Sequence, residues 1–570
     1  MSDRKPGPSR DQVDKVIEFI VANEPLFAVG EIESFGVKQR GYVNAPPDLR
    51  FLMAAAMEHK DNPAVVFEDQ RWSYGELIGK SIALANGLIE RHGVTPGTRV
   101  VLAMRNCPEW MACFLGIIAA GGVVVPMNGW WTSEEVGYGL RDCGAKLVIA
   151  GARQAERMLP HRDSLGLTLI GIREGVEGCT DSFGDLVAAG AGKPAPALTI
   201  KPDDDFAIFY TSGSTGAPKG AVLSHGGAVT AIMSYALIGA GMKHANGGEE
   251  FFGETPGVLV AVPLFHCTGS HAVFMTSLLS GRKMVLMRKW DAGDAVDLIE
   301  REQLTNMVGV PTMSHEVTLE AERRGTRLTS LMDMGSGGAK RPVAHVERLA
   351  KVFPQAWSSS GYGLTETNAL GAYNNMADYQ AKPGSCGRAV PAVTEIKIVR
   401  EDGSTAPTGE PGEVWIKSPC LFKGYLNQPE ATAAVLTRER WFKTGDVGVL
   451  DADGFLSIVD RLKDMVIRGG ENISCLEVEG ALARHSDIVE AAVIGIPDER
   501  LGERVGAAIL LREGATLHND EIDAFLKPHL AAFKRPAHYW RLDAPLPRGG
   551  TGKVDKPGLR KQLLTDGDID

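Results

Sequence analysis

The sequence lacks the features that would mark a disulfide-rich, nucleic-acid-binding or membrane-spanning protein. Its 570 residues include only eight cysteines, which are scattered and form no Cys-x-x-Cys pair, so neither a zinc site nor a disulfide framework is indicated. The net charge of −11 disfavours nucleic acid as a partner, because nucleic-acid-binding proteins present basic surfaces. The longest weakly polar run, residues 114–127, holds three glycines and a proline and is too short to cross a bilayer.

Targeting signals and internal repeats are also missing. The first residues, Met1 to Pro6, are polar and lead into no apolar core. The last residues, Asp566 to Asp570, do not form the Ser-Lys-Leu peroxisomal address. Scattered thiols are typical of a reducing compartment, so we expect a cytoplasmic protein. A composition of 44% hydrophobic and 23% charged residues is that of a globular enzyme.

Hydrophobic patterning predicts several subdomains, because a chain of this length is too long for one core. Residues 1–45 predict an N-terminal extension with a helix, and residues 46–460 predict a large domain of parallel sheets covered by helices. Within it, residues 394–459 alternate in short strands, which favours a small β-barrel or antiparallel subdomain. Residues 461–570 predict a small α+β domain. The clearest strand patterns of the large domain are Arg99–Ala103, Gly122–Pro126, Leu147–Ala150, Gly257–Val262 and Lys283–Met287.

The most informative segment runs from Tyr210 to Gly220 and reads Tyr-Thr-Ser-Gly-Ser-Thr-Gly-Ala-Pro-Lys-Gly. Glycines allow a backbone to approach a ligand closely, successive N–H groups form an anion nest, and Lys219 adds a positive charge. A buried strand precedes the loop, so the segment predicts a phosphate-binding site. It is not a Walker loop, because Pro218 precedes the lysine and a glycine follows it. A flexible polar linker is the alternative interpretation.

This segment resembles the phosphate loop of the adenylate-forming superfamily, which includes acyl-CoA synthetases, firefly luciferases and peptide-synthetase adenylation domains. The resemblance runs from about Glu68 to Lys556 and includes nine motifs in the family order. It implies a large N-terminal α/β domain, a small mobile α+β C-terminal domain, and a reaction that uses ATP, Mg²⁺ and coenzyme A. In the loop it implies Lys219 as a catalytic residue, Thr215 as a metal ligand, and ATP contacts by Thr211, Ser212, Gly213, Ser214, Thr215 and Gly216.

Two further motifs imply contacts with the rest of the nucleotide. Gly361-Tyr-Gly-Leu-Thr-Glu366 resembles the adenine and metal motif, in which the tyrosine stacks on adenine, the threonine contacts the α-phosphate and the glutamate binds Mg²⁺. Trp441-Phe-Lys-Thr-Gly-Asp446 resembles the ribose motif, whose aspartate accepts from both ribose hydroxyls. From the residues alone, a turn followed by a capped helix is the alternative for the first motif, and a β-turn is the alternative for the second. The implied residues are Gly361, Tyr362, Gly363, Thr365, Glu366 and Asp446, with Thr365 and Glu366 catalytic.

Two segments resemble the walls of the acyl pocket. Gly335-Ser-Gly-Gly-Ala339 is similar to the loop that lines this pocket and passes beneath adenine, so Gly337, Gly338 and Ala339 are implied there, with Gly338 also contacting AMP. Pro263-Leu-Phe-His266 is similar to the segment whose aromatic or histidine residue gates the acyl tunnel. An ordinary strand-to-helix turn is the alternative for the first segment, and a core histidine is the alternative for His266. Asn128-Gly-Trp-Trp131 departs from the family pattern, and no role follows from the sequence for its two tryptophans.

The remaining motifs lie near the C-terminus. Asp460-Arg-Leu-Lys-Asp464 resembles the hinge motif, which implies a ribose and phosphate contact by Arg461 and a pivot at Lys463; a solvated charge cluster is the alternative. Pro547-Arg-Gly-Gly-Thr-Gly-Lys-Val554 resembles the loop of the catalytic lysine, here Lys553, and a flexible loop is its alternative.

Two segments resemble the parts of the family that contact coenzyme A. Arg468-Gly-Gly-Glu-Asn-Ile-Ser474 is similar to the loop that packs against the pantetheine arm, and Phe533-Lys-Arg-Pro536 to a segment near the nucleotide. For the second segment a surface basic patch is the alternative. The implied contacts are Arg468, Gly469, Gly470, Glu471, Phe533 and Arg535.

Together these motifs predict an acid–thiol ligase that forms an acyl-AMP, releases pyrophosphate and transfers the acyl group to coenzyme A. Residues 265–268 contain no carboxylate, and an unpaired buried ammonium is costly, so amino-acid substrates are disfavoured. The small residues 337–339 favour a medium- or long-chain fatty acid or an aryl-alkanoic acid.

Other functions of the same fold stay open at this point. They are an adenylating enzyme that serves a carrier protein, a luciferase-like oxygenase, and a non-enzymatic adenylate sensor. Because Lys553 is present, the sensor is disfavoured. The partners we expect are ATP, coenzyme A and a small carboxylic acid, without nucleic acid and without a transmembrane segment, and a homodimer is left open.

Overall fold

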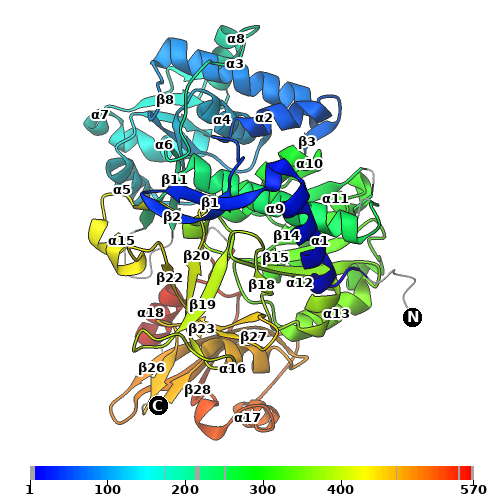
Figure 1. Cartoon of the computed structure of the whole chain (residues 1–570). Helices are drawn as coiled ribbons and strands as arrows, with labels where there is room; N and C mark the ends of the chain where they lie inside the picture. The colour runs from blue at the N-terminus through cyan, green and yellow to red at the C-terminus, as the bar shows by residue number, and fades with distance from the viewer. Residues whose placement is uncertain are drawn as a thin grey trace.

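The structure, a computed structural model, describes residues 7–173, 175–211, 218–249, 252–253, 255–469, 471–549 and 552–566. It has the expected α/β class, with a large N-terminal domain on two mixed sheets and a small C-terminal domain (Figure 1). None of the helices in these ranges is both long and apolar enough to cross a membrane.

The first sheet has eight strands in the order β21-β11-β10-β6-β5-β7-β8-β9. Along β5, Val100 and Leu102 enter one hydrophobic core, while Val101 and Ala103 enter another. Because both faces are buried, such a strand needs a continuous apolar run. The strands are β5 (Arg99–Ala103), β6 (Val123–Pro126), β7 (Leu147–Ala150), β8 (Thr168–Gly171), β9 (Asp181–Ser182), β10 (Asp205–Thr211), β11 (Lys219–Ser224) and β21 (Gly424–Tyr425), and the helices around them are α3 (Tyr74–His92), α4 (Pro108–Ala119), α5 (Ser133–Cys143), α6 (Ala152–Met158), α7 (Arg162–Leu165) and α8 (Phe183–Gly190).

The second sheet has nine strands in the order β18-β17-β16-β15-β14-β12-β13-β3-β4, with parallel strands at its centre. They are β3 (Pro63–Phe67), β4 (Gln70–Ser73), β12 (Gly257–Val260), β13 (Lys283–Leu286), β14 (Asn306–Gly309), β15 (Asp333–Gly337), β16 (Trp357–Tyr362), β17 (Ala372–Asn375) and β18 (Arg388–Ala389). The helices of this part are α2 (Phe51–Ala56), α9 (His225–Ala245), the π-helix η4 (Thr268–Met275), α10 (Thr276–Ser280), α11 (Ala292–Glu302), α12 (Pro311–Arg324), α13 (Val343–Val352) and α14 (Met376–Ala381).

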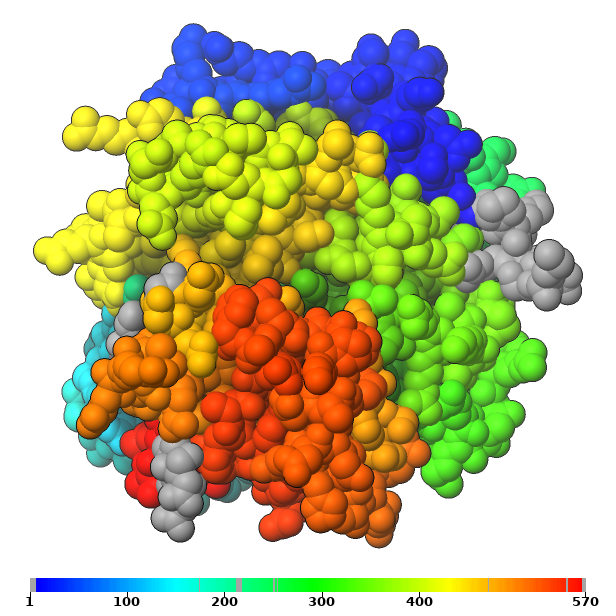
Figure 2. Space-filling model, turned by 90° about the horizontal axis from the view of Figure 1, so that it is seen from below, coloured from blue at the N-terminus to red at the C-terminus, as the bar shows by residue number. Residues whose placement is uncertain are grey.

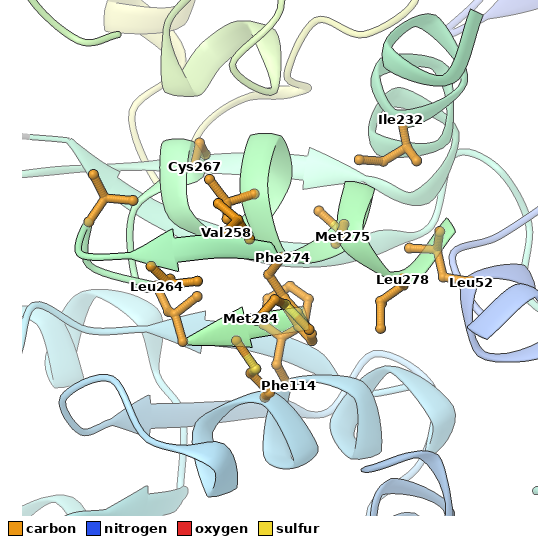
Figure 3. Close-up of a cluster of buried hydrophobic side chains, with 14 of the residues drawn as sticks. Leu52, Phe114, Ile232, Val258, Leu264, Cys267, Phe274, Met275, Leu278 and Met284 are labelled. Atoms are coloured by element: carbon orange, nitrogen blue, oxygen red, sulfur yellow. The ribbon is translucent and has the colours of Figure 1, made fainter. Parts of the chain in front are cut away.

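The two sheets share one hydrophobic core. Figure 3 shows Phe114 of α4 pointing towards Phe274 of η4 and Met284 of β13. The rings of Phe114 and Phe274 meet edge to face, with centroids 6.0 Å apart. This packing joins the helices of the first sheet to the strands of the second, so the loops at the carboxyl ends of both sheets are held relative to one another.

The N-terminal extension contains the expected helix, α1 (Arg10–Asn23), and also a hairpin that the sequence pattern did not indicate. Arg10 is buried, and its guanidinium donates to two backbone carbonyl oxygens of the second sheet at 2.9 Å each. The hairpin, β1 (Val29–Ser34) and β2 (Val37–Tyr42), lies across the N-terminal domain (Figure 1). The extension is therefore packed onto the domain.

Residues 394–459 form the expected antiparallel structure, but not a closed barrel. The strands β19 (Glu395–Val399), β20 (Gly412–Lys417), β22 (Phe442–Leu450) and β23 (Leu456–Arg461) form a four-stranded sheet in this order. Among the described residues β19 and β23 do not pair with each other. Four strands are too few to close around a packed interior, and β23 instead leads directly into the C-terminal domain.

The C-terminal domain is a five-stranded sheet with helices and has hydrophobic cores of its own. Figure 2 shows this domain, coloured orange to red, against the underside of the N-terminal domain. Its elements are β24 (Val466–Arg468), β25 (Glu471–Ile473), α16 (Cys475–Leu482), β26 (Ile488–Asp498), β27 (Gly502–Leu511), α17 (Asn519–Leu526), the short helix η6 (Ala532–Lys534), β28 (His538–Leu542) and α18 (Lys556–Asp566).

Candidate active site

The loop predicted to bind phosphate joins two antiparallel strands, β10 and β11, and not a strand to a helix. Thr211 lies opposite Lys219, and its hydroxyl donates to the Lys219 carbonyl oxygen at 3.4 Å. The Lys219 ammonium lies 5.1 Å from the centre of the Tyr425 ring. The strand pair thus fixes both ends of the loop. The predicted residues Ser212, Gly213, Ser214, Thr215 and Gly216 lie outside the described residues.

Three predicted nucleotide contacts come together in one cluster. The Tyr362 hydroxyl donates to Asp446 Oδ2 at 2.7 Å, and Arg461 Nε lies 3.1 Å from Asp446 Oδ1. Asp446 is only 4% exposed, and this burial raises the pKa of its carboxyl although Arg461 opposes the shift. Each carboxylate oxygen still has a second lone pair. The cluster therefore presents an oriented acceptor that can bind a sugar hydroxyl.

Glu366 lies beside this cluster on the short helix η5 (Thr365–Thr367). The Tyr425 hydroxyl donates to Glu366 Oε1 at 2.7 Å, and burial raises the pKa of this carboxyl. Tyr425 thus contacts Glu366 with its hydroxyl and Lys219 with its ring face. Sequence reasoning missed Tyr425, because nothing near it in the chain marks it as a site residue.

The carboxylate of Glu366 is compatible with a magnesium ion whose other ligands come from outside the protein. In the described ranges no three His, Cys, Asp or Glu side chains are grouped so as to hold an ion. Mg²⁺ in nucleotide sites takes one or two carboxylates and completes its shell with phosphates and water. The buried carboxylate of Glu366 would supply one such ligand.

Lys553 reaches from the C-terminal domain into a small cavity of about 10 Å³ in the N-terminal domain. A Cβ at Gly338, where φ is +78°, would lie 3.1 Å from Lys553 Cε, so the lysine stem needs a glycine there. Burial and the charge of Arg461 lower the pKa of Lys553 to about 8, against the attraction of Asp446 and Glu366. The cavity is lined by Val262, Pro263, His266, Thr268, Val310, Gly338 and Lys553.

His266 lines the same cavity and is held neutral. Burial, with the charge of Lys553 second, lowers the pKa of His266 to about 3. The Thr268 N–H donates to His266 Nδ1 at 3.3 Å, so the ring proton sits on Nε2. The cavity has room for no more than one water molecule, so nothing larger fits beside His266 and Lys553 in this arrangement.

A buried polar network behind His266 was not predicted from the sequence. The segment after it, η4, is a π-helix, a form that is frequent at functional sites. Its His271 hydrogen bonds through Nε2 to Asn368 Oδ1 at 3.0 Å, and the Asn368 amide donates to the Cys420 carbonyl oxygen at 2.6 Å. Each of these atoms has a partner, so the network holds η4 against the loop that carries Glu366.

The predicted hinge lies at the junction of the two domains. Lys463 belongs to the turn that follows β23, in which the Asp464 N–H donates to the Arg461 carbonyl oxygen at 3.0 Å. Burial lowers the pKa of Lys463. One short turn therefore joins the Asp446–Arg461 cluster to the first strand of the C-terminal domain.

The predicted coenzyme A contacts are not brought to the cavity. Arg468, Gly469 and Glu471 belong to the hairpin of β24 and β25, and none of them lines the cavity. Gly470 lies outside the described residues. Arg535 donates to Asp523 Oδ2 at 2.5 Å, and Phe533 packs against the C-terminal core. Among the described residues of the C-terminal domain, only Lys553 lines the cavity.

Two family models match the chain. Residues 52–426 match the family described as AMP-binding enzyme, and residues 477–553 match the AMP-binding enzyme C-terminal domain. The first match includes the segment around His266 and the short helix that carries Glu366. The second match ends at Lys553.

Curated relatives cover nearly the whole chain. It is 35% identical over 495 residues to feruloyl-CoA synthase of an Amycolatopsis species, covering 86% of this chain and 94% of the relative. It is 34% identical over 528 residues to 3-[(3aS,4S,7aS)-7a-methyl-1,5-dioxo-octahydro-1H-inden-4-yl]propanoyl:CoA ligase of Mycobacterium tuberculosis, with 90% and 99% coverage. It is 31% identical over 541 residues to long-chain-fatty-acid–CoA ligase of Bacillus subtilis, with 90% and 93% coverage.

Solved structures are also similar to this chain over nearly their whole length. ATP-bound MatB from Rhodopseudomonas palustris has a TM-score of 0.78 and 29% identity, and the match covers 91% of this chain and 99% of that one. The o-succinylbenzoate coenzyme A synthetase MenE of Bacillus subtilis, in complex with ATP and magnesium ion, has a TM-score of 0.76 and 27% identity, with 90% and 99% coverage.

Proposed function

The chain belongs to the AMP-binding enzyme family and is an ATP-dependent acid–CoA ligase, and on this premise we propose how its residues carry out the two half-reactions. The observation that carries the proposal is the position of Lys553, which the C-terminal domain inserts beside Gly338 and His266 of the N-terminal domain. A positive charge that reaches the cavity from a separate domain can serve one half-reaction and be withdrawn for the other.

In the first half-reaction the substrate carboxylate attacks the α-phosphorus of ATP. A new O–P bond forms, the bond to the β-phosphate oxygen breaks, and pyrophosphate leaves. Lys553 stabilises negative charge on the carboxylate and α-phosphate, and Thr365 contacts the same phosphate. Asp446 accepts from the ribose hydroxyls and Arg461 contacts ribose and phosphate. The loop between β10 and β11, with Lys219, holds the outer phosphates.

Magnesium would be held by Glu366 and by Thr215 of the phosphate loop, together with phosphate oxygens. The ion would supply neutralisation of charge on the phosphates. The Tyr425 hydroxyl, which donates to Glu366 at 2.7 Å, keeps this carboxylate in one orientation and leaves its other oxygen for the ion.

In the second half-reaction the C-terminal domain turns about Lys463. This turn withdraws Lys553 and brings the proposed coenzyme A contacts Arg468, Gly469, Gly470 and Glu471 to the N-terminal domain. The thiolate of coenzyme A then attacks the acyl carbonyl, the C–S bond forms, and the C–O bond to AMP breaks. The 461–464 turn supports this role because it is the covalent link at which β23 passes into the C-terminal domain.

We propose a medium- or long-chain fatty acid or an aryl-alkanoic acid as the substrate. The pocket segments contain glycines 337 and 338 and a neutral His266, and the described residues that line the cavity of Lys553 include no carboxylate. The relatives named above act on feruloyl, long-chain fatty and ring-bearing propanoyl groups, according to their names. The chain's eight free cysteines are compatible with the cytoplasm, which we propose as its location.

An acid panel tests the substrate class. Pyrophosphate exchange should proceed with hydroxycinnamic, arylpropanoic or C8–C18 fatty acids and should stay at background with each free α-amino acid, because nothing in the cavity pairs with an ammonium group. Acyl-CoA formation is followed in parallel by thiol consumption. Exchange with an α-amino acid and none with simple acids would show that the substrate class is wrong.

Deprotonation of Lys553 in the substrate-free enzyme should set the upper pH limit of the first half-reaction. The pKa of Lys553 is lowered to about 8, so the charged form is present below that pH and is lost as the pH rises through it. The kcat/KM of adenylation reports groups of the free enzyme and should fall by up to ten-fold per pH unit above about pH 8. In Lys553→Arg, whose guanidinium stays charged, the residual activity should lack this fall. A flat wild-type profile up to pH 10 would contradict the assignment.

A further inference from the structure

The loop that carries Lys553 is tied to β26 by one ion pair. Arg548 lies at the start of this loop, and its Nη2 donates to Glu490 Oε1 at 2.7 Å. The other oxygen of Glu490 accepts from the Leu546 N–H at 2.9 Å. Because both oxygens of Glu490 are engaged, its carboxylate is held in one orientation. The pair therefore fixes the chain where the lysine loop, residues 547–555, begins.

Arg548 also shapes the loop itself. Its Nη1 donates to the Gly552 carbonyl oxygen at 3.1 Å. The backbone closes the same turn, because the Gly549 N–H donates to the Lys553 carbonyl oxygen and the Gly552 N–H to the Gly549 carbonyl oxygen, both at 2.9 Å. Arg548 and Val554 pair at the base of this turn. One fork-shaped guanidinium thus links the carboxylate on β26 to the peptide group that precedes Lys553.

The C-terminal side of the lysine loop is held separately. Lys556 Nζ, at the start of α18, lies 2.6 Å from Glu479 Oε1 of α16. The same oxygen accepts from the Val493 N–H of β26 at 2.8 Å. Because this second anchor does not involve Arg548, loss of Arg548 should loosen the loop without unfolding the C-terminal domain.

The turn held by Arg548 packs against the start of α12 in the N-terminal domain. A Cβ at Gly552, where φ is +80°, would lie 3.3 Å from Val310 Cγ2, and Val310 lines the cavity of Lys553. Burial raises the pKa of Glu316, in the second turn of α12, and the charge of Arg548 opposes this rise. The shape of the turn therefore decides where Lys553 crosses the junction between the domains.

The contacts of Arg548 indicate an indirect role. Both terminal nitrogens of its guanidinium are engaged within the C-terminal domain, by Glu490 and by Gly552. Among the described residues that line the cavity of Lys553, Arg548 is absent. Lysine carries its charge on a flexible stem, so the place of its ammonium depends on how the backbone of the loop is held.

We propose that Arg548 is a positioning residue for the adenylation half-reaction, and that Glu490 is the anchor through which it acts. Arg548 holds the peptide group before Lys553, so that the lysine ammonium is presented beside Gly338. The inference rests on the proposed function, because it concerns the same lysine. When the C-terminal domain turns, these contacts stay within that domain and move with it, so Arg548 takes no part in the second half-reaction.

Separate assays of the two half-reactions test this role in the full-length enzyme. Arg548→Ala should lower the kcat of pyrophosphate exchange about 10- to 100-fold, because a shift of about 1 Å in a reacting group can cost about 10²-fold. The KM for ATP and for the acid should stay within about two-fold of wild type, since the guanidinium is directed to Glu490 and Gly552. Release of AMP from supplied acyl-AMP with coenzyme A should also keep its wild-type rate.

Two milder variants carry the same test. Arg548→Lys keeps the charge but not the fork, and should recover part of the rate that Arg548→Ala loses. Glu490→Gln keeps an acceptor for the Leu546 N–H but removes the charge, and should lower the kcat of exchange less than Arg548→Ala does. Thermal melting shows which variants are folded, and these two decide the question if Arg548→Ala is not.

The pH profile reports whether Lys553 has moved. Burial is the main cause of its lowered pKa, so a loosened loop should let the pKa rise towards its ordinary value of 10.5. In Arg548→Ala the upper pH limit of exchange should therefore lie about one unit above the wild-type limit. Arg461, Asp446 and Glu366, the charged groups that act on Lys553, are unchanged in this variant. A variant that is only less stable would keep the wild-type limit.

Arg541→Ala is the matched control. The Arg541 guanidinium also donates to a backbone carbonyl oxygen of the C-terminal domain, that of Leu517 at 2.9 Å, but beside α17 and not at the lysine loop. It should leave both half-reactions and the pH limit unchanged.

Three results would overturn the inference while wild type is active: a wild-type kcat of exchange in folded Arg548→Ala, equal losses in both half-reactions, or an unshifted pH limit. If the wild-type enzyme forms acyl-AMP from no acid of the panel, the proposed function fails, and the inference fails with it.

Discussion

Lys553→Ala should slow acyl-adenylate formation by about 10²–10³-fold, the cost of removing one preorganised charge-stabilising donor. Thioester formation from supplied acyl-AMP should remain within a few-fold of wild type, since Lys553 acts only in the conformation that places it beside Gly338. Pyrophosphate exchange measures the first half-reaction. Release of AMP from acyl-AMP in the presence of coenzyme A measures the second.

A lysine of the same domain provides the control. Lys561 is exposed on α18, and Lys561→Ala should leave both half-reactions unchanged. Circular dichroism and thermal melting should show that Lys553→Ala is folded, because its removal deletes a buried charge and no buried partner. If both half-reactions fell equally in Lys553→Ala, the lysine would serve both conformations, and the proposed withdrawal of its loop would be wrong.

Lys463→Pro should reduce acyl-CoA production by at least 100-fold while acyl-AMP still forms and stays bound. Proline fixes φ near about −65° and removes an N–H donor, and in the described residues the Lys463 N–H makes no backbone hydrogen bond. The substitution therefore removes no backbone hydrogen bond from the arrangement that inserts Lys553, but it restricts the rotation that the second half-reaction requires. Single-turnover experiments that separate acyl-AMP from acyl-CoA give the result.

Lys463→Ala is the control for the side chain, because it leaves the backbone free to rotate. It should produce acyl-CoA at a rate close to that of wild type. A soluble, folded Lys463→Pro variant with wild-type acyl-CoA production would show that the pivot lies elsewhere. Loss of both half-reactions would mean that proline also displaces Lys553, and the pyrophosphate exchange assay detects this directly.

The sequence by itself determined the features that depend on neighbouring residues. Continuous apolar runs such as Arg99–Ala103 predicted buried parallel strands, because a strand covered on both faces needs apolar residues at every position. The glycine-rich loops around residues 211–220 and 335–339 predicted ligand contact, since only glycine permits the close approach seen where Gly338 meets Lys553. These signals are local, so the fold class and the family could be inferred without coordinates.

Only the tertiary structure decided which of these segments meet. The Tyr362–Asp446 hydrogen bond joins strands of two different sheets, so it depends on how these sheets are placed. The ion pair between Arg461 and Asp446 follows from the register of the paired strands β22 and β23. The contact of Tyr425 with both Glu366 and Lys219 has no counterpart in sequence spacing. The same holds for Trp130, whose position on Phe265 joins residues 135 apart in the chain. Side-chain contacts of this kind are set by packing between elements, which residue order does not encode locally.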